Sequence, residues 1–303
     1  MLDLSQNWVV YGDNAEVLPR LPDGAFSLIY IDPPFNTGRE QKRQTLTARR
    51  VETEKETEKE PVEGLGGEGT QVRGFQGERY SISRGSITAY GDQFDDYLGF
   101  IVPRLQEAHR LLSQEGTLYF HIDYREAHYC KIALDEIFGR EAFINEIIWA
   151  YDYGGRPKRR WPAKHDTILV YAKDPEGYFF DQDAVERIPY MAPGLVTPEK
   201  AERGKLPTDV WWHTIVGTNA AEKTGYATQK PEGILRRIVS ASCRLGDTVL
   251  DFFAGSGTTG AVCQQLDRRF VLIDNNPQAI HTMAARLGAE DVNYIDGSAT
   301  NIK

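Results

Sequence analysis

Short apolar runs alternate with amphipathic segments along much of the chain. The run Phe-Ser-Leu-Ile-Tyr-Ile at 26–31 is apolar at nearly every position and ends abruptly at Asp32. Such a run predicts a strand buried on both faces, as in a parallel sheet. Residues 95–112 instead repeat apolar side chains at helical spacing. The same patterns predict further strands at 9–11, 116–122, 144–151, 248–252 and 270–273, and helices at 15–21, 129–138, 231–241, 258–266 and 277–287.

The alternation of strands and helices after residue 231 is typical of βαβ units and a parallel sheet. We therefore expect an α/β fold, a doubly wound and mostly parallel sheet of about seven strands with helices on both faces. A chain of 303 residues is long enough for one large α/β domain that carries a smaller insertion.

Two segments depart from this pattern. Residues 39–77 include a charged low-complexity stretch at 52–60 and a glycine-rich stretch at 64–69, and they predict a mobile charged loop. This loop is either a solvated insertion or a lid beside an active site. Residues 152–224 are irregular and proline-rich, and we expect them to form the inserted domain. The main domain would then consist of residues 1–151 and 225–303.

Composition is that of an ordinary soluble protein, with 41% hydrophobic and 26% charged residues. No apolar run reaches the ~18 residues of a membrane span, and the first residues lack the features of a secretory signal. The three cysteines are widely spaced, which favours free thiols in a reducing cytoplasm and predicts no metal site. We expect a cytoplasmic protein that does not bind membranes.

A glycine turn follows the strand predicted at 248–252. It reads Asp-Phe-Phe-Ala-Gly-Ser-Gly-Thr-Thr from Asp251, and its glycines allow a tight turn and a close approach of backbone to a ligand. No lysine follows the glycines, so this is not a phosphate loop. Asp251 before the turn would repel pyrophosphate and would suit a cationic or zwitterionic ligand. Asp274 ends the next strand, at a distance typical of acids that bind ribose hydroxyls.

A second turn, Asp32-Pro33-Pro34-Phe35, ends the strand predicted at 26–31. Ligands of open α/β sheets bind at this edge. The prolines remove two backbone donors and leave carbonyl groups free to accept. A carboxylate and a rigid carbonyl can together hold both hydrogens of an amino group, and Phe35 offers a stacking face to a planar base. A proline-stiffened loop without a ligand is the alternative.

The net charge of −9 argues mildly against a nucleic-acid partner, but the local distribution of charge matters more. Residues 154–165 carry basic side chains, no acid and an indole ring, which suit phosphate neutralisation and stacking: Arg156, Lys158, Arg159, Arg160, Trp161 and Lys164. A solvated basic loop is the alternative.

Three segments in this order resemble the amino-group DNA methyltransferases: Asp-Pro-Pro-Phe-Asn-Thr-Gly at 32–38, Gly-Tyr-Ala-Thr-Gln-Lys-Pro at 225–231, and the glycine turn at 251–259. The target-base segment precedes the cofactor segment, which is similar to the permuted β arrangement of that family. The form of the first segment resembles the modification subunits of type III systems. The resemblance implies a Rossmann-like fold that uses S-adenosylmethionine, with residues 152–224 as a target-recognition domain.

The resemblance also assigns residues to roles. It implies that Asp32, Pro33, Pro34 and Phe35 are catalytic and hold a flipped base. The cofactor would be bound by Asp13, Thr228, Gln229, Lys230, Pro231, Asp251, Phe253, Gly255, Ser256, Gly257, Thr258 and Asp274. The family more often has glutamate where this chain has Asp274.

The implied activity is transfer of a methyl group to N6 of adenine in duplex DNA by base flipping and direct in-line attack. Methylation of cytosine N4 uses the same geometry and stays open. A non-catalytic DNA-binding module and an RNA methyltransferase are further alternatives. A cognate restriction endonuclease and a homodimer stay open as partners. His121 and His128 are too far apart in sequence for a helical metal-ligand pair, so we expect structural roles for them.

Overall fold

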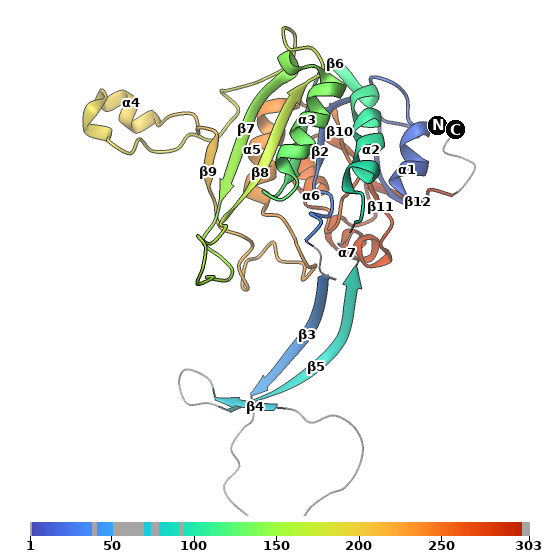
Figure 1. Cartoon of the computed structure of the whole chain (residues 1–303), viewed down its shortest axis with the longest axis vertical. Helices are drawn as coiled ribbons and strands as arrows, with labels where there is room; N and C mark the ends of the chain where they lie inside the picture. Colours follow the sequence, from blue (N-terminus) through green and yellow to red (C-terminus); the bar gives the residue numbers. More distant parts are fainter. Residues whose placement is uncertain (1, 38–40, 51–69, 74–78, 91–93, 299–303) are drawn as a thin grey trace, which may run out of the picture. The chain divides into compact units, whose positions relative to one another are not determined.

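The computed structural model describes residues 2–37, 41–50, 70–73, 79–90 and 94–298. The chain divides into two compact units, residues 1–37 with 94–303, and residues 38–93. The larger unit contains β1 (Asn7–Tyr11), β2 (Phe26–Ile31), β6 (Leu112–Ile122), β7 (Phe143–Ala150), β8 (His165–Ala172), β9 (Val210–Trp212), β10 (Thr248–Asp251), β11 (Arg269–Asp274) and β12 (Val292–Asp296). These strands form one nine-stranded sheet in the order β12-β1-β11-β10-β2-β6-β8-β7-β9 (Figure 1).

Every neighbouring pair in this sheet is parallel except those that include β8, which runs antiparallel to both β6 and β7. The expectation of a doubly wound, mostly parallel sheet is confirmed. The sheet has nine strands rather than seven. The strand β8, which lies in the segment expected to be irregular, was not predicted from the sequence, and neither were β9 and β12. Both are edge strands with partly exposed side chains, and polar residues interrupt the apolar pattern of β12.

Helices cover both faces of the sheet. On one face lie α1 (Asn14–Val17), α2 (Tyr97–Leu111) and α3 (Ala127–Phe138), and on the other lie α5 (Glu232–Ser242), α6 (Thr258–Gln265) and α7 (Pro277–Leu287). Alternate residues of β2 belong to separate cores. Ile29 and Ile31 pack with the α2 and α3 side, whereas Leu28 and Tyr30 pack with the α5 and α6 side. The continuous apolar run of β2 therefore reflects burial on both faces.

The helix ends follow local sequence signals. The side chain of Asp96 caps α2 by accepting a hydrogen bond from Gly99 N, and Asn276 caps α7 in the same way through Gln278 N. Gly139 and Gly288 follow the ends of α3 and α7 with positive φ values of 90° and 73°. Among the described helices, none is long and apolar enough to cross a membrane.

The smaller unit is an antiparallel sheet of β3 (Gln41–Arg50), β4 (Thr70–Arg73) and β5 (Arg79–Tyr90), in the order β3-β5-β4. The loop expected over 39–77 is therefore wrong for residues 41–50 and 70–73. These strands lack a clear apolar alternation, and their pairing rests on the backbone ladder instead. The charged stretch at 52–60 and the glycine-rich stretch at 64–69 lie outside the described residues.

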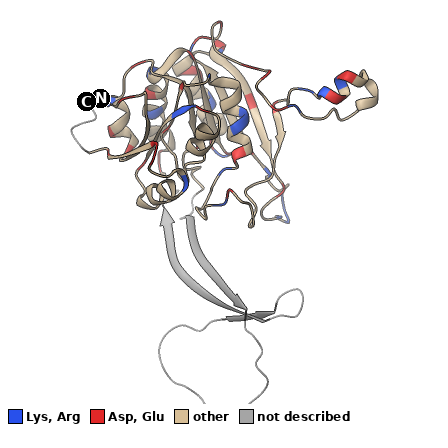
Figure 2. Ribbon diagram, turned by 180° about the vertical axis from the view of Figure 1, so that it is seen from behind, with Lys and Arg blue, Asp and Glu red and all other residues tan. Residues whose placement is uncertain are grey.

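The segment 152–224 does not fold apart from the main sheet, contrary to the expected domain boundary. It contributes β8 and β9 to that sheet, and all of it belongs to the larger unit. The part between these strands includes η3 (Pro193–Leu195) and α4 (Pro198–Arg203), neither of which has a buried residue. This part stands off the sheet in Figure 1, joined at its base by the Ile188–Lys205 bridge, and carries both acidic and basic side chains (Figure 2). The short helices η1 (Leu18–Arg20) and η2 (Arg140–Ala142) complete the larger unit.

Candidate active site

The carboxyl edge of the parallel strands gathers acidic side chains from distant parts of the sequence. Each of five strands ends in an aspartate or is followed by one within two residues: β1 by Asp13, β2 by Asp32, β6 by Asp123, β10 by Asp251 and β11 by Asp274. Because the strands are parallel and in register, these carboxylates lie along one edge, where open α/β sheets bind their ligands.

The two carboxylate oxygens of Asp32 have different surroundings. Its Oδ2 atom lies 2.5 Å from Nζ of Lys230, which comes from the segment before α5. The same ammonium lies 4.8 Å from the centre of the Phe35 ring. The other oxygen, Oδ1, is buried and accepts no hydrogen bond from the described residues. The carboxylate therefore offers its outward oxygen to a cation that also contacts an aromatic face.

The residues around Phe35 fix the shape of this turn. Pro33 is buried, whereas Pro34 and Phe35 are half-buried. Asn36 adopts a left-handed conformation with φ of 53°, and its side chain donates to Oε1 of Glu126 at 2.8 Å and accepts from Phe94 N at 2.9 Å. Asn36 was not among the predicted site residues, although an asparagine after a rigid turn is a common choice for a positive φ.

A hydrogen-bonded group lies beneath Asp32 and was also missed by the sequence analysis. His121 is fully buried, and its Nδ1 atom lies 2.8 Å from the Tyr30 hydroxyl and 3.7 Å from Oδ1 of Asp32. Its Nε2 atom lies 3.2 Å from Oδ2 of Asp166. The Tyr151 hydroxyl donates to Oδ1 of Asp166 at 3.0 Å. His121 thus has the structural contacts that were expected of it, but they lie directly against a predicted catalytic residue.

Burial and charge have opposite effects on the pKa of Asp166, but they both raise the pKa of Tyr30. Burial alone would raise the pKa of Asp166, but its hydrogen bond from His121 and the nearby positive charge of Lys230 lower it. Burial raises the pKa of Tyr30 well above its usual range, and the charges of Asp32, Asp251 and Asp166 raise it further. Asp166 is therefore a carboxylate and Tyr30 a neutral phenol around neutral pH.

The glycine turn has the backbone geometry that its sequence predicts. Gly255 and Gly257 have positive φ values of 51° and 72°, and Gly257 directly precedes α6. Asp274 accepts hydrogen bonds from Gly255 N and Asn276 N, both at 2.8 Å, one on each carboxylate oxygen. Each oxygen of Asp274 retains a lone pair for a ligand hydroxyl group.

Asp251 is buried beneath the same turn and stabilises it through hydrogen bonds. Its side chain is 2% exposed, accepts from Thr259 Oγ1 at 2.5 Å on one oxygen and from Phe253 N at 3.1 Å on the other. Burial raises the pKa of Asp251 to about 7, although both hydrogen bonds lower it. The acid that sequence analysis assigned to a cationic ligand is thus engaged within the protein.

Several other predicted cofactor residues also make internal contacts. Thr258 donates to the Lys230 carbonyl group and accepts from Arg286, and the Ser256 hydroxyl lies 3.1 Å from that of Thr258. The Gln229 side chain joins Thr224 to the Glu222 carbonyl group. These contacts connect the segment 225–231 to the start of α6.

The remaining predicted residues of the cofactor group lie at the ends of elements. Thr228 has a positive φ of 60°, and Pro231 directly precedes α5. Asp13 caps α1 and pairs with Arg104 at 3.2 Å, and its side chain is half-exposed. The Phe253 ring contacts that of Phe100.

One aromatic residue near the turn was not predicted. The Tyr226 ring lies so close to Gly255 that a Cβ atom there would come within 3.4 Å of it. Its hydroxyl oxygen accepts from Asn276 at 3.3 Å. Tyr226 belongs to the segment 225–231 that resembles the DNA methyltransferases, but nothing in its spacing indicated a contact with the glycine turn.

The basic residues lie on the loop that joins β7 to β8. Because β7 runs parallel to β6, this loop leaves the sheet at the same edge as Asp32. Trp161 is 94% exposed, and Arg156, Lys158, Arg159 and Arg160 are exposed as well. Lys164 differs from them, since its ammonium donates to the carbonyl groups of Tyr153 and Gly154 at 2.6 and 2.7 Å.

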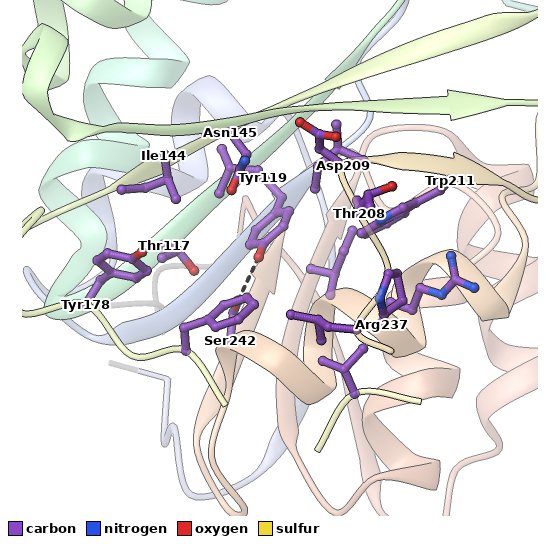
Figure 3. A pocket seen from close by; sticks show the side chains of 17 residues that line it. Thr117, Tyr119, Ile144, Asn145, Tyr178, Thr208, Asp209, Trp211, Arg237 and Ser242 are labelled. Carbon is purple, nitrogen blue, oxygen red and sulfur yellow. Dashed lines mark hydrogen bonds between the residues drawn. The ribbon is translucent and has the colours of Figure 1, made fainter. Parts of the chain in front are cut away.

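A cavity of about 280 Å³ lies away from this edge, between the middle of β6, the first half of β7 and the second half of α5 (Figure 3). Its lining includes Tyr178 and Trp211, and the Tyr119 hydroxyl bonds to that of Ser242 at 2.8 Å. Oγ1 of Thr117 is buried there without a hydrogen-bond partner among the described residues. None of the predicted site residues lines this cavity.

The fold and these two neighbouring turns define a Rossmann-like methyltransferase. Residues 26–285 match the family model of N6 and N4 methyltransferases, described as DNA methylase, and the chain belongs to that family. Members of this family take their methyl group from S-adenosylmethionine.

Two curated relatives and one solved structure illustrate the match. The type II methyltransferase M.HpaI of Haemophilus parainfluenzae is 34% identical over 65% of this chain, and the match spans 61% of that relative's length. The DNA adenine methyltransferase YhdJ of Escherichia coli is 28% identical over 92% of this chain and 82% of its own length. The PvuII DNA methyltransferase, described as cytosine-N4-specific, has a TM-score of 0.62 at 14% identity, over 97% of this chain and 96% of that one.

Gly257→Ala should destabilise the protein by about 1–3 kcal/mol, because an added Cβ would lie 2.7 Å from Met283 and φ would stay positive. Urea unfolding measures this change. Gly246→Ala is the matched control, since its φ is 76° and nothing lies within 4 Å of an added Cβ. Equal losses in both variants would show that the contact with Met283 contributes nothing.

The raised pKa of Asp251 predicts a pH-dependent stability. The folded protein binds this proton more tightly than the unfolded chain, so stability should fall as pH rises from about 4 to about 7. Asp251→Asn should remove this component. The free energy of unfolding of the variant should therefore increase relative to that of the wild type as pH rises, by a few kcal/mol in all, at about 1.4 kcal/mol per pKa unit. Unfolding free energies at several pH values measure the difference, and parallel curves for both proteins would contradict the prediction.

Proposed function

We propose that this protein is a site-specific DNA methyltransferase that transfers the methyl group of S-adenosylmethionine to N6 of adenine in duplex DNA. The observation that carries the proposal is the ammonium of Lys230 between the Asp32 carboxylate and the Phe35 ring. In chemical terms this ammonium stands in for the exocyclic amino group of a target base. An N–H donor on the carboxylate and a contact with the ring are what such a base requires.

The chemistry then follows from the residues of the first turn. Asp32 and the carbonyl group of Pro33 hold the amine hydrogens and stabilise the positive charge that develops on nitrogen. Phe35 stacks on the flipped base. S-adenosylmethionine supplies an electrophilic methyl group on a sulfonium ion. Positioning and electrostatics carry the catalysis, and no covalent intermediate with the protein is needed.

The cofactor would bind along the neighbouring strand ends. Asp274 would accept ribose hydroxyl groups, and the turn from Phe253 through Gly255 and Gly257 would let the backbone approach the ligand. Residues 228–231 would contact its methionine end, with Asp13 nearby. Asp251, Ser256 and Thr258 would serve from inside, by holding the turn in shape.

The choice of adenine rests on Asp32. The Asp-Pro-Pro-Phe form favours adenine, and the relative YhdJ, which matches most of this chain, is described as an adenine methyltransferase. Methylation of cytosine N4 is the second candidate, favoured by the solved PvuII structure. Both reactions need the same contacts to an amino group. Single-molecule sequencing of DNA from a host that expresses the chain distinguishes them and identifies the recognition site.

Duplex DNA is the proposed partner, and the loop between β7 and β8 is its proposed contact. Residues 152–224 would recognise the target sequence, and Trp161 in this segment would stack on a base. A cognate restriction endonuclease, a homodimer and a cytoplasmic location belong to the same proposal. Activity of the purified chain alone on its recognition site tests whether a partner protein is needed.

Asp32→Ala should lower methyl transfer by about 10²-fold or more, because the developing charge loses its carboxylate. S-adenosylmethionine affinity should stay within a few-fold, since the glycine turn is unchanged. Incorporation of labelled methyl groups and calorimetry measure the two effects. Asp23→Ala is the control, because it removes an exposed carboxylate that pairs with Arg110 outside residues 152–224. Turnover of the Asp32 variant at the wild-type rate would refute the assignment.

Replacing Arg159 and Arg160 with alanine should flatten the salt dependence of DNA binding. Each phosphate contact adds about −0.9 to the slope of log K against log salt, so the change is up to about 2. Binding measured by fluorescence anisotropy over a salt series gives the slope. The matched control replaces Arg140 and Arg244, which removes the same charge from exposed positions outside residues 152–224. If the Arg159 and Arg160 variant has the wild-type slope, these residues do not contact phosphates and the loop is solvated.

A further inference from the structure

The buried ring of His121 has contacts on both nitrogen atoms, and these contacts decide where its hydrogen lies. Asp166 accepts a hydrogen bond from Nε2, because an ionised carboxylate has no hydrogen to give. Nε2 therefore carries the hydrogen. The neutral Tyr30 hydroxyl lies 2.8 Å from Nδ1 and can donate to it. Both contacts agree on one form of the ring, with the hydrogen on Nε2 and a lone pair on Nδ1.

The Nδ1 side of the ring also lies next to the Asp32 carboxylate. Nδ1 lies 3.7 Å from Oδ1 of Asp32, the oxygen that is buried and accepts no hydrogen bond from the described residues. If the ring hydrogen moved to Nδ1, it would be donated to the Tyr30 oxygen, and the Tyr30 hydroxyl hydrogen would be released from the ring. That hydroxyl would then be a donor on the buried side of the Asp32 carboxylate, and a hydrogen bond there would weaken the outward oxygen as an acceptor.

We propose that Asp166, acting through His121, is a positioning residue for the Asp32 carboxylate. By keeping the hydrogen on Nε2, Asp166 leaves the inward oxygen of Asp32 without a donor. The outward oxygen, which Lys230 holds in this structure, then remains the strong acceptor for the target amine. Tyr151 completes the group, because its hydroxyl fixes the second oxygen of Asp166.

The residues of this group come from three neighbouring strands, so their contacts depend on the register of those strands. Tyr30 lies on β2, His121 on β6 and Asp166 on β8, and β6 lies between the other two in the sheet. His121 pairs with Ile168, and Asp166 lies two residues before Ile168 on β8, so its side chain is on the same face of the sheet as the His121 ring. A small change in the β6–β8 register would therefore break the contact with Asp166.

This inference rests on the proposed function for its kinetic consequence, but its structural part can be tested alone. In the full chain labelled with ¹⁵N-histidine, the His121 nitrogens should show the neutral form with hydrogen on Nε2. His121→Asn identifies the signals by their loss. A ring protonated on both nitrogens, or one with hydrogen on Nδ1, would overturn the proposal whether or not the protein methylates DNA.

Asp166→Val removes the acceptor and keeps a side chain that suits a strand. The His121 signals should shift toward the Nδ1–H form, and kcat should fall about tenfold or more, since small misplacements in an active site are costly. KM for S-adenosylmethionine should stay within about twofold, because no cofactor contact is lost. Tyr151→Phe should give a smaller change in the same direction.

Asp135→Val is the matched control. Asp135 also accepts from a tyrosine, Tyr171 at 2.7 Å, but it lies on α3 outside the predicted site. Its kcat and its His121 signals should match the wild type. A folded Asp166→Val protein with wild-type kcat would overturn the proposal. If that variant does not fold, Tyr151→Phe and the wild-type spectrum decide. A wild type that methylates no DNA would refute the proposed function and leave the spectrum as the test.

Discussion

The parallel alignment of neighbouring strands is the constraint on which the rest of the structure depends. It brings the ends of β1, β2, β6, β10 and β11 to one edge, so aspartates far apart in sequence become neighbours. Like charges at one edge repel each other and raise the cost of ionisation. The protein counters this cost with a different partner for each acid, and those partners determine which carboxylate can meet a ligand.

The partners divide the acids into two groups. Asp251 and Asp274 accept hydrogen bonds from the turn that they support, and burial raises the pKa of both. Asp32 instead pairs with a side chain, the ammonium of Lys230. A hydrogen bond to the backbone is permanent in the folded state, whereas an ion pair at a half-buried site can exchange its cation for another donor. Asp32 is thus the acid best suited to a transient amine.

The sequence predicted most of this framework, because buried parallel strands and capped helices have strong local signals. The run 26–31, the capped helix at 277–287 and the glycine turn all appear as expected. The short strand β9 and the paired strands β3 to β5 were missed, since their pairing depends on partners distant in sequence. The same reason hides Asp166, whose role comes from the antiparallel register of β8 with β6.

The hairpin of β7 and β8 has a consequence for how such a protein can diversify. Ala150 pairs with His165, so the whole basic loop is enclosed between two paired residues of the ladder. Residues can be added to or removed from that loop without shifting Asp166, which is the next residue along β8. Under the proposed assignment, the loop that would contact DNA can change in length while the proposed transfer site keeps its geometry.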